Sequence, residues 1–268
     1  MMVYIGTSGF SFRDWIGKVY PENIRKSSML TYYALEWKFN AVELNFTYYA
    51  PLSKRTAVSL LRKTPSDFVF AVKIPGPVTH EFWKKGDPPD TDEILERFVE
   101  SLEPFDQEGR VGVLLAQFPG SFQKSVKAMD YLKSLKDLLA DRDLAVEFRH
   151  ESWVDEETYR FLEGAGITHV IADEPRVDAL YPYIPRVTSE TTYFRFHGRN
   201  LNWFRAYGSE RYNYDYSEEE LRTFAQDVKK ALKRAKRAFI FFNNCFNGKA
   251  VLNAMRLREI LQASDGCN

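Results

Sequence analysis

The chain has 268 residues, of which 44% are hydrophobic and 28% charged, and its 37 basic residues balance its 37 acidic ones. This length suits one (β/α)8 barrel of about 250 residues or two small domains, and zero net charge gives no global field to attract nucleic acid or an anionic membrane. Two cysteines and no long apolar run argue against a disulfide framework and a membrane span, so we expect a soluble, cytoplasmic protein.

Strand-like and helix-like segments alternate along the whole chain. Runs typical of buried strands recur at residues 3–6, 41–46, 68–74, 111–117, 144–149, 168–173, 192–197 and 238–243. Helical periodicity occurs at residues 28–38, 53–63, 91–103, 124–139, 154–164, 217–236 and 246–262. The segment 174–190 carries three prolines and predicts a loop. This order predicts one α/β domain over residues 1–268, a TIM barrel with parallel strands.

Four of these strands end in polar clusters, in the stretches AVELNFTYY (41–49), LAVEFRHESW (144–153), TTYFRFHGRN (191–200) and AFIFFNNCFNG (238–248). Side chains alternate across a strand, so polar residues two apart share a face while their apolar neighbours face the helices. The side chains predicted to point into the barrel are Glu43, Asn45, Lys73, Gln117, Glu147, Arg149, Asp173, Arg195, His197 and Asn243. They predict a polar site at the carboxyl ends of the strands, where TIM barrels place their active sites.

The same charges could instead pair with one another and plug the barrel mouth. Three acidic residues among them balance three basic ones, which makes a structural plug a real alternative. An apolar plug would be cheaper, however, because polar groups at so many strand ends are costly to satisfy. We therefore favour a ligand-binding or catalytic role.

The leading functional hypothesis is an enzyme, a hydrolase or isomerase, that acts on a phosphorylated or other small anionic substrate. Cationic side chains would hold the anion, a glutamate would act as general acid/base and a histidine would assist proton transfer. The candidate catalytic residues are Glu43, Glu147 and His197. The candidate substrate-binding residues are Asn45, Tyr48, Lys73, Gln117, Arg149, His150, Asp173, Arg195, Gly198, Asn243 and Asn244. A non-catalytic small-ligand sensor would use the same pocket.

The loops after the seventh and eighth strands are the expected anion site. They begin HGRN and NNCFNG, at the place where this fold often holds phosphate. We expect a phosphate, sulfate or carboxylate within hydrogen-bonding distance of Arg195 or His197, with the Gly198 N–H and the Asn243 amide as further donors. Alternatively, the neighbouring glutamates already saturate Arg195.

A metal site is not assigned, and no cofactor is implied. The chain has four histidines, and His169 opens the sixth strand at the opposite end of the barrel, where a structural role is expected. The lysine and arginines of the mouth would repel a divalent cation, and neither HExxH nor CxxC spacing occurs. A divalent metal is the lesser alternative.

The long segment 199–216 holds six aromatic residues and three arginines. Aromatic rings interleaved with arginine suit stacking against bases, so Trp203, Arg205 and Tyr207 are candidates for nucleic-acid binding or for a lid. The alternative is a self-packed loop that covers the top of the barrel, and the sequence supports both equally.

Eight motifs spread over most of the chain resemble one known family. They are GTSGFSFRDW, VELNFTYY, FAVKIPGPVTH, AQFP, AVEFRHESW, DEP, YFRFHGRN and FFNNC, in order from Gly6 to Cys245. Together they resemble the YecE-like family, whose members have no established function. The resemblance implies a TIM barrel, similar in fold to the endonuclease IV and xylose-isomerase-like barrels, and implies no reaction.

Overall fold

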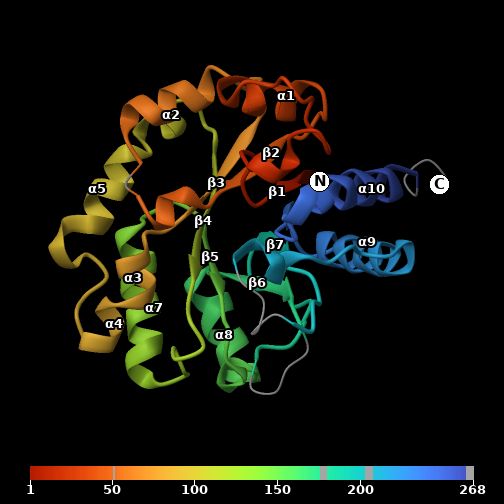
Figure 1. The fold of residues 1–268 in the computed structure, drawn as a ribbon. Helices are drawn as coiled ribbons and strands as arrows, with labels where there is room; N and C mark the ends of the chain where they lie inside the picture. Colours follow the sequence, from red (N-terminus) through yellow and green to blue (C-terminus); the bar gives the residue numbers. More distant parts are fainter. Residues whose placement is uncertain (51, 176–179, 203–207, 264–268) are drawn as a thin grey trace.

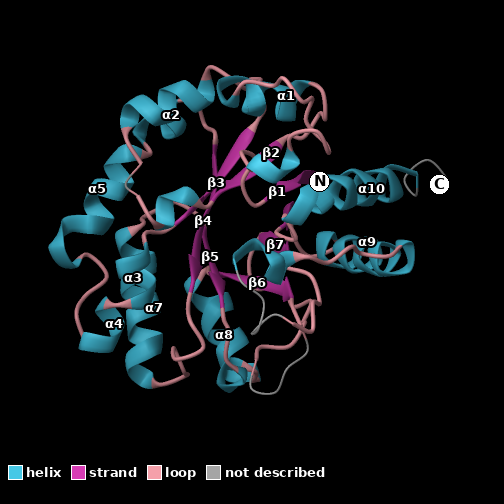
Figure 2. Ribbon diagram, in the orientation of Figure 1, coloured by secondary structure: helices cyan, strands magenta, loops and turns pink. Residues whose placement is uncertain are grey.

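The computed structural model describes residues 1–50, 52–175, 180–202 and 208–263. Parallel strands form an eight-stranded sheet in the order β1-β8-β7-β6-β5-β4-β3-β2, and the helices surround it (Figures 1 and 2). The strands are β1 (Met2–Thr7), β2 (Ala41–Leu44), β3 (Val69–Lys73), β4 (Val111–Gln117), β5 (Leu144–Glu147), β6 (Thr168–Asp173), β7 (Thr191–Phe196) and β8 (Arg237–Phe242). The predicted (β/α)8 fold is confirmed, with each strand within a few residues of its predicted range.

The long helices follow the predicted periodicity. They are α1 (Met29–Leu35), α2 (Lys54–Leu61), α5 (Ile94–Ser101), α7 (Val126–Leu138), α8 (Glu156–Ala165), α9 (Glu218–Leu232) and α10 (Lys249–Ala263). Of these, α2, α7, α8 and α9 start at side-chain caps. The Ser217 side chain accepts from Glu220 N–H in a capping box, as the sequence predicts. Three short helices were not predicted: α3 (Gly76–His80), α4 (Phe82–Lys85) and α6 (Glu103–Gln107). None of the helices in the described ranges is long and apolar enough to cross a membrane.

The barrel interior is apolar below the mouth and is filled by small and aromatic side chains. Alanines from four strands leave room for the rings of Tyr193, Phe239 and Phe241, which are fully buried. The remaining members of this cluster are Ala41, Val69, Ala71, Val113, Leu115, Ala145, Val170 and Ala172. Bulky aromatic and branched residues packed in layers are typical of this core, and here they form a dry floor beneath the polar strand ends.

A tyrosine hydroxyl joins β1 to β2, the two ends of the sheet. Tyr33 on α1 accepts a hydrogen bond from Thr7 N–H at 2.8 Å and donates to the Ala41 carbonyl at 2.9 Å. A Cβ on Gly6 would collide with this hydroxyl and with the Ala41 carbonyl oxygen, so the position requires glycine. The hydroxyl therefore takes the place of a direct backbone hydrogen bond between β1 and β2.

An asparagine closes the same seam, the junction between β1 and β2, nearer the amino end of β1. The Asn40 side chain accepts from Ile5 N–H and donates to the Val3 carbonyl, both at 2.8 Å. Further along the two strands, Ser8 and Glu43 form an isolated parallel β-bridge, and the Gly9 N–H donates to the Glu43 carbonyl at 2.9 Å. Side chains thus satisfy backbone groups that a continuous ladder would otherwise pair.

His169 lies outside the barrel, in an aromatic environment remote from the mouth. Its ring packs against Tyr159 and Tyr181, and Nδ1 lies 3.3 Å from the Arg186 carbonyl. Burial lowers the pKa of His169 to about 4, so the ring is neutral at physiological pH. The structural role expected for this residue fits these contacts.

Acidification should destabilise the protein partly through His169. Because the folded-state pKa lies below the unfolded one, the unfolded chain binds more protons, and stability falls as the pH drops from 6.5 toward 4. We expect roughly 3 kcal/mol of pH-dependent stability from this residue. Urea unfolding at pH 4.5 to 8.5 measures the free energy of unfolding at each pH. Below pH 6.5, this free energy should fall less steeply for His169→Gln than for the unmodified protein. Parallel curves through that whole range would contradict the assignment.

Candidate functional site

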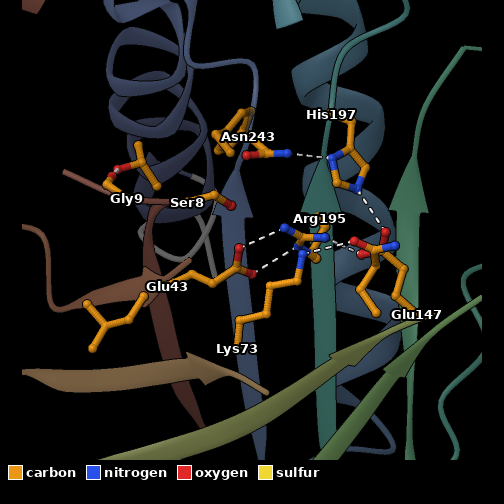
Figure 3. Close-up of polar contacts among 12 residues, drawn as sticks. Ser8, Gly9, Glu43, Lys73, Glu147, Arg195, His197 and Asn243 are labelled. Atoms are coloured by element: carbon orange, nitrogen blue, oxygen red, sulfur yellow. Dashed lines mark hydrogen bonds and ion pairs between the residues drawn. The ribbon is translucent and has the colours of Figure 1, made fainter. Parts of the chain in front are cut away.

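A cavity of about 1050 Å3 opens at the carboxyl ends of the strands. Polar side chains on β3, β4 and β7, or just after the ends of β5, β7 and β8, line it, and several of them are shown in Figure 3. Of the predicted site residues, those that line it are Asn45, Lys73, Gln117, Arg149, Arg195, His197 and Asn243. The loop after β1 also lines it, through residues 8–12 and 14, whereas Trp15 is fully buried and donates its indole N–H to the Cys245 carbonyl.

Arg195 is the centre of the buried charge network. Its Nε donates to Glu43 Oε2 at 2.9 Å and its Nη2 to Glu43 Oε1 at 2.8 Å, while Nη1 donates to Glu147 Oε2 (Figure 3). Tyr193 adds a fourth hydrogen bond, to Glu43 at 2.7 Å. Both glutamates are 0% exposed and Arg195 is 2% exposed. The structure therefore has the second of the two predicted arrangements, in which neighbouring glutamates accept the hydrogen bonds of Arg195.

These contacts determine the ionisation of the two glutamates. Burial alone would raise the pKa of Glu43, but Arg195 and Tyr193 hold it below its usual range. Burial likewise opposes ionisation of Glu147, yet Arg149, Arg195 and His197 bring its pKa well below the usual range. Both carboxylates are charged at neutral pH and serve as fixed acceptors.

Arg149 connects this network to a further carboxyl group. Its guanidinium pairs with Glu147 and with Glu174, which follows β6. Burial raises the pKa of Glu174 to about 7 despite Arg149, so this group is partly protonated near neutral pH. Burial also lowers the pKa of His197 to about 4, and its Nδ1 lies 2.8 Å from Asn243 Nδ2 (Figure 3). His197 is thus a neutral imidazole held between neighbours.

Lys73 differs from the arginines because it has no carboxylate partner in the described residues. Its Nζ donates to Gln117 Oε1 at 2.9 Å and lies 4.6 Å from the centroid of the Tyr48 ring. Burial and the charge of Arg195 lower the pKa of Lys73 to about 8. The ammonium group lines the cavity with its charge uncompensated by direct contact.

The prediction that Asp173 points into the barrel is wrong. In the register of β6 with β7, Ala172 is opposite Arg195 and Asp173 is opposite Phe196, so Asp173 faces the helices. Its carboxylate accepts from both Arg199 and the Tyr216 hydroxyl. The neighbouring acid, Glu174, pairs with Arg149 of the network instead, and it was not among the predicted site residues. Alternation from the small residues Val170 and Ala172 could have identified it.

Three further predicted contacts do not form at the cavity. His150 accepts from Ser152 N–H at the start of a short 3-10 helix, so its side chain acts as a cap. The Gly198 N–H donates to the Tyr216 hydroxyl at 2.8 Å and is not presented to a ligand. Asn244 is fully buried, and its amide donates to the Tyr214 carbonyl and to Asn253. Tyr48 is placed more favourably, with its ring against the Lys73 ammonium.

The segment 199–216 is described only in part. Trp203, Arg205 and Tyr207 lie outside the described residues, so their predicted role stays a prediction. Tyr216 is buried among aromatic rings and the Tyr214 hydroxyl donates to Glu220, which is the self-packing alternative for this half of the segment. Arg211 and Tyr212 instead line the cavity.

The donor set of the mouth suits an anion better than a cation. Within the described ranges, no group of three or more histidine, cysteine or acidic residues could hold a metal ion. Among the described residues that line the cavity, one is acidic, Asp14, and six are basic: Lys26, Lys63, Lys73, Arg149, Arg195 and Arg211. Buried glutamates pair with Arg149 and Arg195, and the other four basic residues add positive charge to the walls of the open space.

Comparison with known proteins identifies the relatives of this chain. The sequence pattern described as "Protein of unknown function DUF72" matches residues 4–267. The chain is 30% identical to the UPF0759 protein YunF of Bacillus subtilis in an alignment of 275 residues that covers 97% of this chain and 95% of that protein. It is 26% identical to the UPF0759 protein YecE of Escherichia coli in an alignment of 188 residues that covers 68% of this chain and 63% of that protein. A crystal structure of a DUF72 family protein from Thermotoga maritima superposes with a TM-score of 0.92 at 52% identity, covering 98% of this chain and all of that one.

Proposed function

The chain belongs to the DUF72 family of proteins of unknown function, and from its site we propose an enzyme that acts on a small phosphorylated or otherwise anionic substrate. The observation that carries the proposal is the arrangement of charge at the barrel mouth. Cations line a cavity large enough for a metabolite, and the carboxylates that pair with two of them, Arg149 and Arg195, are buried.

The buried network supports positioning rather than proton transfer by the glutamates. Glu43 and Glu147 are fully buried, already paired and have lowered pKa values, so neither is suited to exchange protons with a substrate. They hold Arg195 in one orientation, and preorganised cations stabilise negative charge that develops during a reaction. We therefore assign Glu43 and Glu147 as positioning residues, in place of the general acid/base role expected from the sequence.

The proton-transfer role falls to Lys73. It lines the cavity, and its pKa of about 8 lies near the working pH, which is the condition for efficient general acid/base catalysis. His197 is a poorer candidate because its imidazole is neutral, with a pKa of about 4. It supports binding through its contacts with Arg149 and Asn243.

Thermal unfolding in a panel of sugar phosphates, each compared with its unphosphorylated sugar, tests the proposal. We expect some phosphorylated compounds, and inorganic phosphate at higher concentration, to raise Tm while the matched sugars do not. Product formation from the best ligand, followed by NMR, should fall by about 10²–10⁴-fold in Lys73→Met. Lys133→Met, at an exposed position on α7, is the matched control and should behave as the unmodified protein.

Two results would overturn the enzymatic proposal. Stabilisation by a ligand that is never converted would make the protein a sensor. Stabilisation by a short oligonucleotide alone, with no response to any phosphorylated metabolite, would favour nucleic-acid binding instead.

A further inference from the structure

Lys73 has the surroundings of a nucleophile. Its amine ends at the wall of the cavity, on a strand end, with a neutral amide and an aromatic ring as its direct neighbours. In Figure 3 the side chain extends toward Arg195, whose positive charge disfavours a second cation nearby. A lysine that is desolvated or close to another cation is activated for attack on carbonyl groups.

We propose that Lys73 forms a covalent imine with a carbonyl group of the anionic substrate. The inference rests on the proposed function and narrows its substrate class to small molecules that carry both an anionic group and an aldehyde or ketone. Lys73 would then act first as nucleophile, and its nitrogen would withdraw electrons from the adjacent carbon once the imine is protonated.

The step is balanced without any further reagent. The amine nitrogen attacks the carbonyl carbon and a C–N bond forms. The carbonyl π-electrons move onto the oxygen, which takes a proton from the nitrogen and becomes a hydroxyl group. Loss of that hydroxyl with the second nitrogen proton releases water and leaves a C=N bond. Hydrolysis reverses both steps and regenerates the amine.

The neighbours of Lys73 favour the neutral amine that this step needs. At a pKa of about 8, the neutral fraction at pH 7.5 is roughly two-hundredfold greater than that of a lysine with the ordinary value of 10.5. The amide oxygen of Gln117 accepts a hydrogen bond from the Lys73 nitrogen at 2.9 Å. Because this oxygen is uncharged, it does not stabilise the ammonium form of Lys73 as a carboxylate would. The cations that line the cavity beside it would hold the anionic end of the same substrate.

Reductive trapping tests the inference on the unmodified protein. The protein is incubated with dihydroxyacetone phosphate or with dihydroxyacetone in the presence of sodium cyanoborohydride, and labelled peptides are mapped by mass spectrometry. We expect saturable labelling of Lys73 by the phosphorylated ketone, at least about tenfold faster than at any other lysine, given the greater neutral fraction. Dihydroxyacetone should label Lys73 much more slowly, and inorganic phosphate should compete with labelling by dihydroxyacetone phosphate.

The outcomes separate this inference from the proposed function. If Lys73 is not labelled preferentially although inorganic phosphate raises Tm, anion binding stands and the imine is wrong. Equal labelling of Lys73 by both ketones would overturn the anionic substrate class. Absence of both labelling and any phosphate response would overturn the two proposals together. Lys73→Met should abolish the main label, and Lys133→Met should retain it.

Discussion

Replacing Arg195 with leucine is expected to lower the free energy of unfolding by about 3–5 kcal/mol. The substitution leaves Glu43 without a charged partner in the described residues and removes one of the two arginines that pair with Glu147, and both carboxylates are 0% exposed. An uncompensated buried charge must be protonated or hydrated, and each route costs free energy. Guanidinium denaturation followed by circular dichroism measures the loss.

Two comparison variants show whether burial causes the effect. Arg256 on α10 pairs with Glu218 and Glu259, but its side chain is 45% exposed, so Arg256→Leu should have little effect. Adding Glu43→Gln and Glu147→Gln to Arg195→Leu removes the buried charges and should recover much of the stability. Equal losses for Arg195→Leu and Arg256→Leu would show that the network is not a buried ion cluster in solution.

Removing a single hydroxyl in Tyr33→Phe is expected to cost about 2–4 kcal/mol, because two backbone groups lose their partner together. The Thr7 N–H and the Ala41 carbonyl both lie in fully buried positions and both bind that hydroxyl. The Tyr33 ring is 0% exposed, so bulk solvent does not reach these two groups in the folded protein. Thermal and chemical unfolding measure the cost, and hydrogen exchange at Thr7 should accelerate.

Tyr32→Phe is the matched control for this substitution. Tyr32 lies on the same helix with its ring half-buried against Tyr20 and Trp37, and no hydrogen bond of its hydroxyl occurs within the described ranges. It should change stability by less than about 0.5 kcal/mol. If both variants were equally stable, the β1–β2 seam would not depend on the Tyr33 hydroxyl.

The location of the site was predictable because charged residues break the apolar pattern of buried strands. Glu43, Glu147, Arg195 and His197 interrupt otherwise apolar strands, and the alternation of side chains predicts that they converge inside the barrel. The structure brings all four together at one end of the barrel. Their roles were less predictable, because a role depends on which partner each group meets across the barrel.

Strand ends were where prediction by alternation failed. Asp173 and Glu174 are adjacent acids of the same charge, so within the sequence only the phase of alternation from Val170 and Ala172 distinguishes them. The choice is made by the register of β6 against β7, which turns Asp173 toward Arg199 and Glu174 toward Arg149. A one-residue error in phase exchanges the two faces of a strand.

By itself, the sequence determined the barrel, its strands, its main helices and the end that carries the polar site, because these follow from periodicity, capping and the alternation of side chains within single segments. Only the tertiary structure decided that Arg195 is occupied by two buried glutamates, that Lys73 lacks a carboxylate partner in the described residues, and that Tyr33 closes the seam between β1 and β2. Those outcomes depend on distances between residues far apart in the chain, and charge pairing and burial are set by such distances.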